Sequence, residues 1–198
     1  MLLDRRRSLL LVIDVQEKLA PVIAEGTARI ARIRLLLEGA RRLEVPVLAT
    51  EQYPKGLGPT VADLLPLPEG GERFEKIAFS AMRDAAFAGH LASRGREQIL
   101  LCGMETHVCV LQTALDLLAG GYAVFAVADA CGSRRDSSHQ LGLARLQQEG
   151  ARIVDSEMVL FEWLEEAGSD RFRAISRLIK SPAIRHPGRA CVPRIPPA

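Results

Sequence analysis

The stretch from residue 99 to residue 118 constrains the fold of this chain more than any other. It opens with an unbroken apolar run, Ile99 to Cys102, which is typical of a strand buried on both faces of a parallel sheet. Gly103 ends the run, and from Val108 onward apolar residues recur at helical spacing. Thr106 stands where an N-cap is expected. The stretch therefore predicts a strand, a tight turn and a helix.

The same alternation of strand-like and helix-like segments extends along most of the chain. Further strands are predicted at 8–13, 46–50, 73–80, 122–128 and 152–154, and helices at 27–44, 84–93, 136–149, 157–166 and 170–180. Strands that alternate with helices indicate the α/β class. We expect a three-layer sandwich, in which helices flank a six-stranded, mostly parallel sheet. The arginine-rich face of the 27–44 helix is expected to be solvated.

The length of 198 residues and an apolar content of 48% fit a single domain with a full core. We place this domain at residues 1–180. The segment 181–198 contains five prolines and no acidic residue, so it is expected to lie extended on the surface or on a partner subunit.

Charge and cysteine usage exclude several classes of protein. The formal net charge is +2, which gives no reason to expect nucleic-acid binding. No apolar run is long enough to span a membrane, and the run that Asp14 ends is too short for a signal peptide. The four cysteines lack zinc-site spacing. A reducing, cytoplasmic setting is the expectation.

Cys109 lies in the first turn of the predicted helix, where free backbone N–H groups carry partial positive charge. Such a position favours the thiolate form of a cysteine and can also stabilise an oxyanion. The residue is therefore either a nucleophile or, as free cysteines usually are, a small buried apolar side chain.

Two further residues can join Cys109 at one edge of the sheet. Asp14 ends the first strand, and in a doubly wound sheet the first and fourth strands can be neighbours. Asp14 can then take the thiol proton, while Lys76 supports the charged forms of both groups. The strand pattern around Lys76 alone favours an exposed lysine. Asp129 also ends a predicted strand and is expected to have a structural role, capping the next loop through Arg134 or Arg135.

At three places in the right order the sequence resembles the isochorismatase-like cysteine hydrolases, a family that includes nicotinamidases. These places are Leu-Val-Ile-Asp-Val-Gln at 11–16, Lys76, and Gly-Met-Glu-Thr-His-Val-Cys-Val at 103–110. Residues 50–61 further resemble the isochorismatase domain-containing subgroup. The resemblance covers roughly residues 8–180 and implies a six-stranded parallel sheet.

The resemblance also implies the composition of the site. It assigns a catalytic triad to Asp14, Lys76 and Cys109, and a cis peptide bond to Met104–Glu105. The backbone N–H groups of Glu105 and Cys109 would then receive the oxyanion. Substrate-binding residues are expected among four positions near the site, namely Gln52, Tyr53, Phe79 and Thr106.

One departure from the nicotinamidases bears on metal binding. Those enzymes hold a metal through histidines in the loop after the second strand, whereas residues 51–54 of this chain contain none. We therefore expect no metal and no other cofactor. His107 is the one histidine near the site, where it can form a hydrogen bond, and no catalytic role is assigned to it. The family implies a homo-oligomer.

The leading prediction is a metal-independent cysteine hydrolase that acts on a small amide-like or acyl substrate through a thioester. One alternative is enol-ether hydrolysis as in true isochorismatases, which needs an acid and a lysine but no thiol, and which usually goes with another residue at the nucleophile position. A second alternative is an interaction protein whose site is catalytically inactive. The presence of all three triad residues argues against it, because an inactive site does not need them. A dinucleotide-binding domain is excluded, because the turn at Gly103 lacks the glycine-rich fingerprint.

Overall fold

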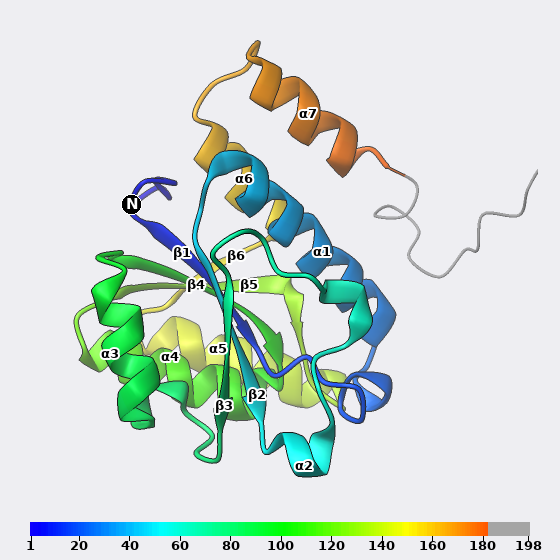
Figure 1. Cartoon of the computed structure of the whole chain (residues 1–198), viewed down its shortest axis with the longest axis vertical. Coiled ribbons are helices and arrows are strands. Elements are labelled where there is room, and N and C mark those ends of the chain that lie inside the picture. Colours follow the sequence, from blue (N-terminus) through cyan, green and yellow to red (C-terminus); the bar gives the residue numbers. More distant parts are fainter. Residues whose placement is uncertain (182–198) are drawn as a thin grey trace, which may run out of the picture.

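A computed structural model describes residues 1–181, and its centre is a six-stranded sheet (Figure 1). The strands are β1 Ser8–Ile13, β2 Val47–Gln52, β3 Glu72–Lys76, β4 Gln98–Met104, β5 Ala123–Gly132 and β6 Arg152–Val154. They lie in the order β3-β2-β1-β4-β5-β6, and every neighbouring pair is parallel. The predicted α/β class is confirmed, with a fully parallel sheet where a mostly parallel one was expected.

Helices cover both faces of the sheet and complete the three layers. They are α1 Gly26–Leu43, α2 Pro54–Leu57, α3 Ala85–Ser93, α4 Leu111–Ala119, α5 Asp136–Gln148, α6 Ser156–Leu164 and α7 Asp170–Ile179. The layer of α1, α6 and α7 lies on one side, and α3, α4 and α5 lie on the other (Figure 1).

The two cores follow from the alternation of side chains along the central strand. Leu10 and Val12 of β1 belong to the core under α1 and α6, whereas Leu9, Leu11 and Ile13 belong to the core under α3 and α4. Successive strand residues point to opposite faces, so a strand covered on both sides reads as a continuous apolar run. All six residues of β1 are buried.

Short polar side chains fix where three of the helices begin. Asp84 accepts a hydrogen bond from the backbone N–H of Phe87 at the start of α3, at 2.9 Å. Asp155 and Ser169 cap α6 and α7 in the same way. These caps satisfy N–H groups that have no partner within the helix.

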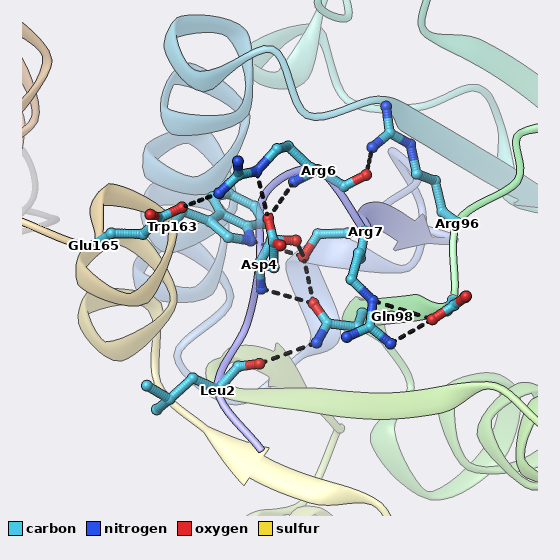
Figure 2. A network of polar contacts seen from close by, with 10 residues as sticks. Leu2, Asp4, Arg6, Arg7, Arg96, Gln98, Trp163 and Glu165 are labelled. Carbon is cyan, nitrogen blue, oxygen red and sulfur yellow. Dashed lines mark hydrogen bonds and ion pairs between the residues drawn. The ribbon is translucent and has the colours of Figure 1, made fainter.

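A polar network ties the amino ends of β1 and β4 to the helical layer (Figure 2). The Gln98 side chain donates to the carbonyl of Leu2 at 3.0 Å and accepts from the backbone N–H of Asp4 at 2.8 Å. The Trp163 indole of α6 donates to the Ser8 hydroxyl at 3.0 Å. This network braces the end of the sheet opposite to the carboxyl ends of its strands.

Strand β5 is longer than predicted, and its extension relocates Asp129. The sequence suggested an end at Ala128, but small residues continue the strand to Gly132, which pairs with Met104 beyond an irregularity in which residues 127–130 of β5 stand opposite Cys102 of β4. Asp129 therefore lies inside the strand. It accepts hydrogen bonds from the backbone N–H and hydroxyl of Ser156, at 2.8 and 2.6 Å. The expected contact with Arg134 or Arg135 is wrong, because the carboxylate is turned toward the start of α6.

The arginine face of α1 is less solvated than expected. Arg29 has only 14% of its side chain exposed and donates to the carbonyl of Ala128 at 3.2 Å. The predicted extended segment 181–198 lies, apart from Ser181, outside the described residues. Among residues 1–181, no helix has the length and apolar character needed to cross a membrane.

Candidate active site

The sheet order brings three strand ends together at its carboxyl edge. β1 lies between β2 and β4, so Asp14, directly after β1, and Cys109, shortly after β4, stand on neighbouring strands. Lys76 is the last residue of β3 and pairs with Gln52 of β2. Because β2 lies between β3 and β1, Gln52 stands between Lys76 and the end of β1, where Asp14 follows. The carboxyl edge of an open α/β sheet is where ligands bind.

Asp14 is completely buried and is held by two donors. Its carboxylate accepts from the Thr50 hydroxyl and from the Lys76 ammonium, both at 2.7 Å. The backbone of Asp14 is left-handed, with a φ of 50°, a conformation that aspartate tolerates better than most residues. A carboxylate has more acceptor sites than these two bonds use, so it can still accept a proton from a third group.

Lys76 is buried, which corrects the exposed position that its strand pattern favoured. Only 3% of the residue is exposed. Its ammonium donates to Asp14 and to the Gln52 side-chain oxygen, both at 2.7 Å, and to the carbonyl of Phe79 at 3.1 Å. A buried charge persists when it is paired and hydrogen-bonded, and Lys76 meets both conditions.

Both the oxygen and the nitrogen of the Gln52 side-chain amide form hydrogen bonds within the protein. The oxygen accepts from Lys76, and the nitrogen donates to the carbonyl of Ile77 at 2.6 Å. The backbone of Gln52 is held in turn by the Gln16 side chain, which accepts from its N–H at 2.8 Å. Although Gln52 lies on the cavity wall, its amide positions Lys76.

Cys109 lies in a wide helical turn, Thr106–Val110, that precedes α4. The backbone N–H of Val110 reaches back five residues to the carbonyl of Glu105, the pattern of a π-turn. The predicted N-cap at Thr106 is wrong: Glu105 is the capping residue, and no side chain caps the turn. Turns of this kind are frequent at functional sites.

The surroundings of Cys109 raise the pKa of its thiol to about 12. Burial is the largest cause, since only 6% of the residue is exposed. The negative charge of Asp14 raises the pKa further, and the positive charge of Lys76 lowers it. The expectation that the helix start favours the thiolate is therefore wrong, because burial and the nearby carboxylate dominate.

Helix α5 packs against the residues that precede Cys109, on the side of the turn away from the cavity. His139 Nδ1 and the Thr106 hydroxyl share a hydrogen bond of 2.8 Å. His107 Nδ1 lies 3.0 Å from the Ser133 hydroxyl. Gly142 packs so closely that a Cβ there would lie 3.2 Å from the backbone of Thr106 and His107. The turn is thus fixed by contacts on the side away from the cavity.

The peptide bond between Met104 and Glu105 is cis, as the resemblance implies. The Glu105 carboxylate accepts from Arg134 Nε at 3.0 Å and from the Arg134 backbone N–H at 3.3 Å. Within residues 1–181, the backbone N–H of Glu105 has no hydrogen-bond acceptor. A free N–H beside the thiol is the kind of donor that can receive an oxyanion.

A cavity of about 310 Å³ opens in front of these residues. Its wall contains Asp14, Lys18, Leu19, Val22, Gln52, Leu57, Phe79, Glu105, Val108, Cys109 and Arg134. Of the four expected substrate-binding residues, Gln52 and Phe79 line it. Tyr53 does not line it: its ring is half exposed and lies over Gly56. Thr106 also lies off the wall, fully buried against His139.

Residues 51–54, at the end of β2 and just after it, contain no histidine, and their one acid is Glu51 of β2. The Glu51 carboxylate accepts from the Thr60 backbone N–H at 2.8 Å and from the Thr60 hydroxyl at 2.6 Å. Across the described part of the chain, no three histidine, cysteine or acidic residues cluster as a metal site would require.

Comparison with known proteins places this geometry in a family. A family model described as the isochorismatase domain matches residues 8–158. The chain belongs to the isochorismatase family of hydrolases. It is 41% identical over 176 residues to isochorismatase domain-containing protein 2A of mouse, covering 88% of this chain and 84% of that one. The human isochorismatase domain-containing protein 2 is also 41% identical, over 89% of this chain and 84% of its own length.

Solved structures agree with the family assignment. A structure described as MAR1 ribonuclease from Caenorhabditis elegans superposes with a TM-score of 0.86 at 33% identity, and covers 100% of this chain and 99% of its own. The YcaC gene product of Escherichia coli, described as an octameric hydrolase of unknown specificity, has a TM-score of 0.81 at 22% identity, over 90% of this chain and 89% of its own. At that identity the second likeness concerns the fold alone.

Several residues of the site were missed at the level of sequence. Gln16, Lys18, Arg134 and His139 all touch the cavity or its supports. A signal existed for the first two, since they follow Asp14 within four positions and so lie at the same sheet edge. No local signal marks His139, whose contact with Thr106 depends on how α5 packs.

Proposed function

We propose that this protein is a cysteine hydrolase that cleaves a small amide-like or acyl substrate, with Asp14, Lys76 and Cys109 as its catalytic residues. The observation that carries the proposal is the buried ion pair of Lys76 with Asp14, 2.7 Å long, whose Asp14 lines a cavity that Cys109 also lines. A nucleophile, a base and a group that orients the base form the usual constellation for covalent catalysis.

The raised pKa of Cys109 fits proton transfer during attack, rather than a thiolate formed in advance. The sulfur attacks the carbonyl carbon while the thiol proton passes to the Asp14 carboxylate. The carbonyl electron pair moves to oxygen, where backbone N–H groups of Glu105 and Cys109 stabilise it. When the C–N bond breaks, the proton on Asp14 passes to the leaving amine, and a thioester remains on Cys109.

Water completes the cycle through the same residues. Asp14 takes a proton from the attacking water, whose oxygen bonds to the thioester carbon. The C–S bond then breaks, a carboxylic acid leaves, and the sulfur regains its proton from Asp14. Lys76 stays charged throughout and holds Asp14 in place, itself positioned by Gln52.

A panel of small amides and esters, read by mass spectrometry, tests the proposal. Wild-type protein is compared with Cys109→Ala and with the matched control Cys102→Ala, which removes a buried thiol from the opposite core. We expect turnover in the wild type and the control, none in Cys109→Ala, and a trapped acyl group on Cys109 in slow substrates. Dialysis against a strong chelator should leave the rate unchanged.

The same variants separate the alternatives. Enol-ether hydrolysis needs Asp14 and Lys76 only, so cleavage of an enol ether added to the panel, if it survives Cys109→Ala, would favour that reaction over the thioester route. Absence of turnover across the panel would favour an interaction protein. The worm relative is described as a ribonuclease, so RNA belongs in the panel. Cleavage of RNA in preference to small amides would overturn the proposed substrate class.

A further inference from the structure

The charges at the cavity do not cancel once Lys76 is counted, which pairs with Asp14 but does not itself line the cavity. Two acids face the cavity, and each has a cationic partner: Asp14 pairs with Lys76 at 2.7 Å, and Glu105 pairs with Arg134 at 3.0 Å. Lys18 also lines the cavity, and within residues 1–181 its ammonium has no acidic partner within ion-pair distance. With Cys109 as a neutral thiol, one positive charge is in excess.

The backbone of Lys18 is held at the rim of the cavity, and the residue is exposed. Its N–H donates to the carbonyl of Leu57 at 3.0 Å, which joins the loop after β1 to the loop after β2. Gln16 strengthens the same junction, since its amide nitrogen donates to the carbonyls of Gln52 at 3.0 Å and Gly58 at 2.6 Å. The nearest acid in sequence, Glu17, points its carboxylate at Gly58 and is not part of the cavity wall.

The rest of the wall is apolar. Leu19, Val22, Leu57, Phe79 and Val108 supply most of it, and the amide of Gln52 is already occupied by Lys76 and Ile77. A cavity of about 310 Å³ lies at the small end of the range for ligand sites. The chemistry of the wall therefore suits a compact apolar body with one anionic group.

We propose that the substrate carries a carboxylate or similar anionic group that Lys18 binds, while its apolar chain lies against Phe79 and its neighbours and its amide faces Cys109. This inference rests on the proposed function, because it names the substrate class for that site. Arg134 contributes indirectly, since its pairing with Glu105 removes a charge that would repel an anion.

A pair of alkylating reagents tests the inference without any turnover. Iodoacetate and iodoacetamide have the same shape and react with the same sulfur, but only iodoacetate carries a charge. Both meet the same Cys109 thiolate, so the ratio of their rates cancels any change in thiol pKa. The ratio therefore reports the electrostatic preference of the cavity at the thiol.

The iodoacetate-to-iodoacetamide ratio at Cys109 is expected to fall about threefold to tenfold in Lys18→Gln, and further in Lys18→Glu, as a unit charge is removed and then reversed at short range. Lys55→Gln is the matched control, because Lys55 is an exposed lysine of α2 outside the cavity wall. It should keep the wild-type ratio. High salt should shrink the differences between variants. Equal ratios in wild type, Lys18→Gln and Lys18→Glu would overturn the inference.

A substrate pair separates this inference from the proposed function. The monoamide of glutaric acid and pentanamide differ mainly by a carboxylate. Wild type should cleave the acidic amide about tenfold more efficiently, and Lys18→Gln should lose that preference. Cleavage of both amides without preference would refute the anion site and leave the hydrolase. A Lys18-dependent alkylation ratio with no turnover of these amides or of the wider panel would refute the hydrolase and leave the anion site.

Discussion

Replacing Lys76 by methionine should cost this protein a large part of its stability. The side chains of Lys76 and Asp14 are 2% and 0% exposed, and their charged atoms lie 2.7 Å apart. Methionine has a similar length and fills the same space without a charge. The substitution leaves a buried carboxylate with the Thr50 hydroxyl as its remaining side-chain donor. Breaking a buried pair in this way typically costs about 3–5 kcal/mol.

The other acceptors around the Lys76 ammonium make the expected loss of stability different for the two members of the pair. Lys76 also donates to Gln52, Phe79 and Ala78, so Asp14→Asn leaves the lysine with three oxygen acceptors. Asp14→Asn should therefore destabilise less than Lys76→Met. The double variant removes both charges, and its loss should be smaller than the sum of the two single losses.

Urea unfolding followed by circular dichroism measures all three losses, with Lys55→Met as the exposed control. Total stabilities are on the order of 5–15 kcal/mol, so the loss in Lys76→Met should be plain in the midpoint. A loss within about 1 kcal/mol of that in Lys55→Met, or strictly additive losses in the double variant, would refute a coupled buried pair.

Three further outcomes follow from the site. Asp14→Asn should lower kcat/KM by at least the ~10²–10⁴ typical of a lost general base, and a value within about threefold of wild type would contradict its role. With a thiol pKa of about 12, alkylation of Cys109 by iodoacetamide should rise roughly tenfold per pH unit from about pH 7 to about pH 10, while fully buried Cys102 stays unlabelled; a plateau below about pH 9 would disagree. Burial, aided by the charge of Arg29, lowers the pKa of His139, so the unfolded state binds its proton first and stability should fall as pH drops below about 6.5. His139→Asn should flatten that loss in a series of urea midpoints, and an unchanged slope would rule His139 out as its source.

The class of fold was predictable because the central strands carry their own signal. Strands β1 and β4 are buried throughout and are apolar after their first residues, Ser8 and Gln98, and such runs between helical patterns specify a parallel sheet. The bounds of β5 were not predictable in the same way. Its extension from Asp129 to Gly132 depends on pairing with the end of β4 beyond the irregularity, which is a contact between distant segments.

The identity of the site residues was predictable from the sequence, whereas their burial and the pKa of Cys109 were not. Asp14 and Cys109 follow strand ends, a position that the sequence marks directly. The burial of Lys76 carries no local signal, because it depends on acceptors from β1 and β2. The raised pKa of Cys109 likewise arises from enclosure by the folded chain, which outweighs the helix-start effect that sequence reasoning emphasised.

The close contact at Gly142 gives the protein a sensitive point outside its cavity wall. A methyl group there would lie 3.2 Å from the backbone of Thr106 and His107, so that backbone would have to move by a few tenths of an ångström. Misplacement of a reacting group by about 1 Å can cost roughly a hundredfold in rate. In a genetic screen for loss of activity, position 142 should therefore be hit as readily as the cavity itself, in a protein that is still made and folded.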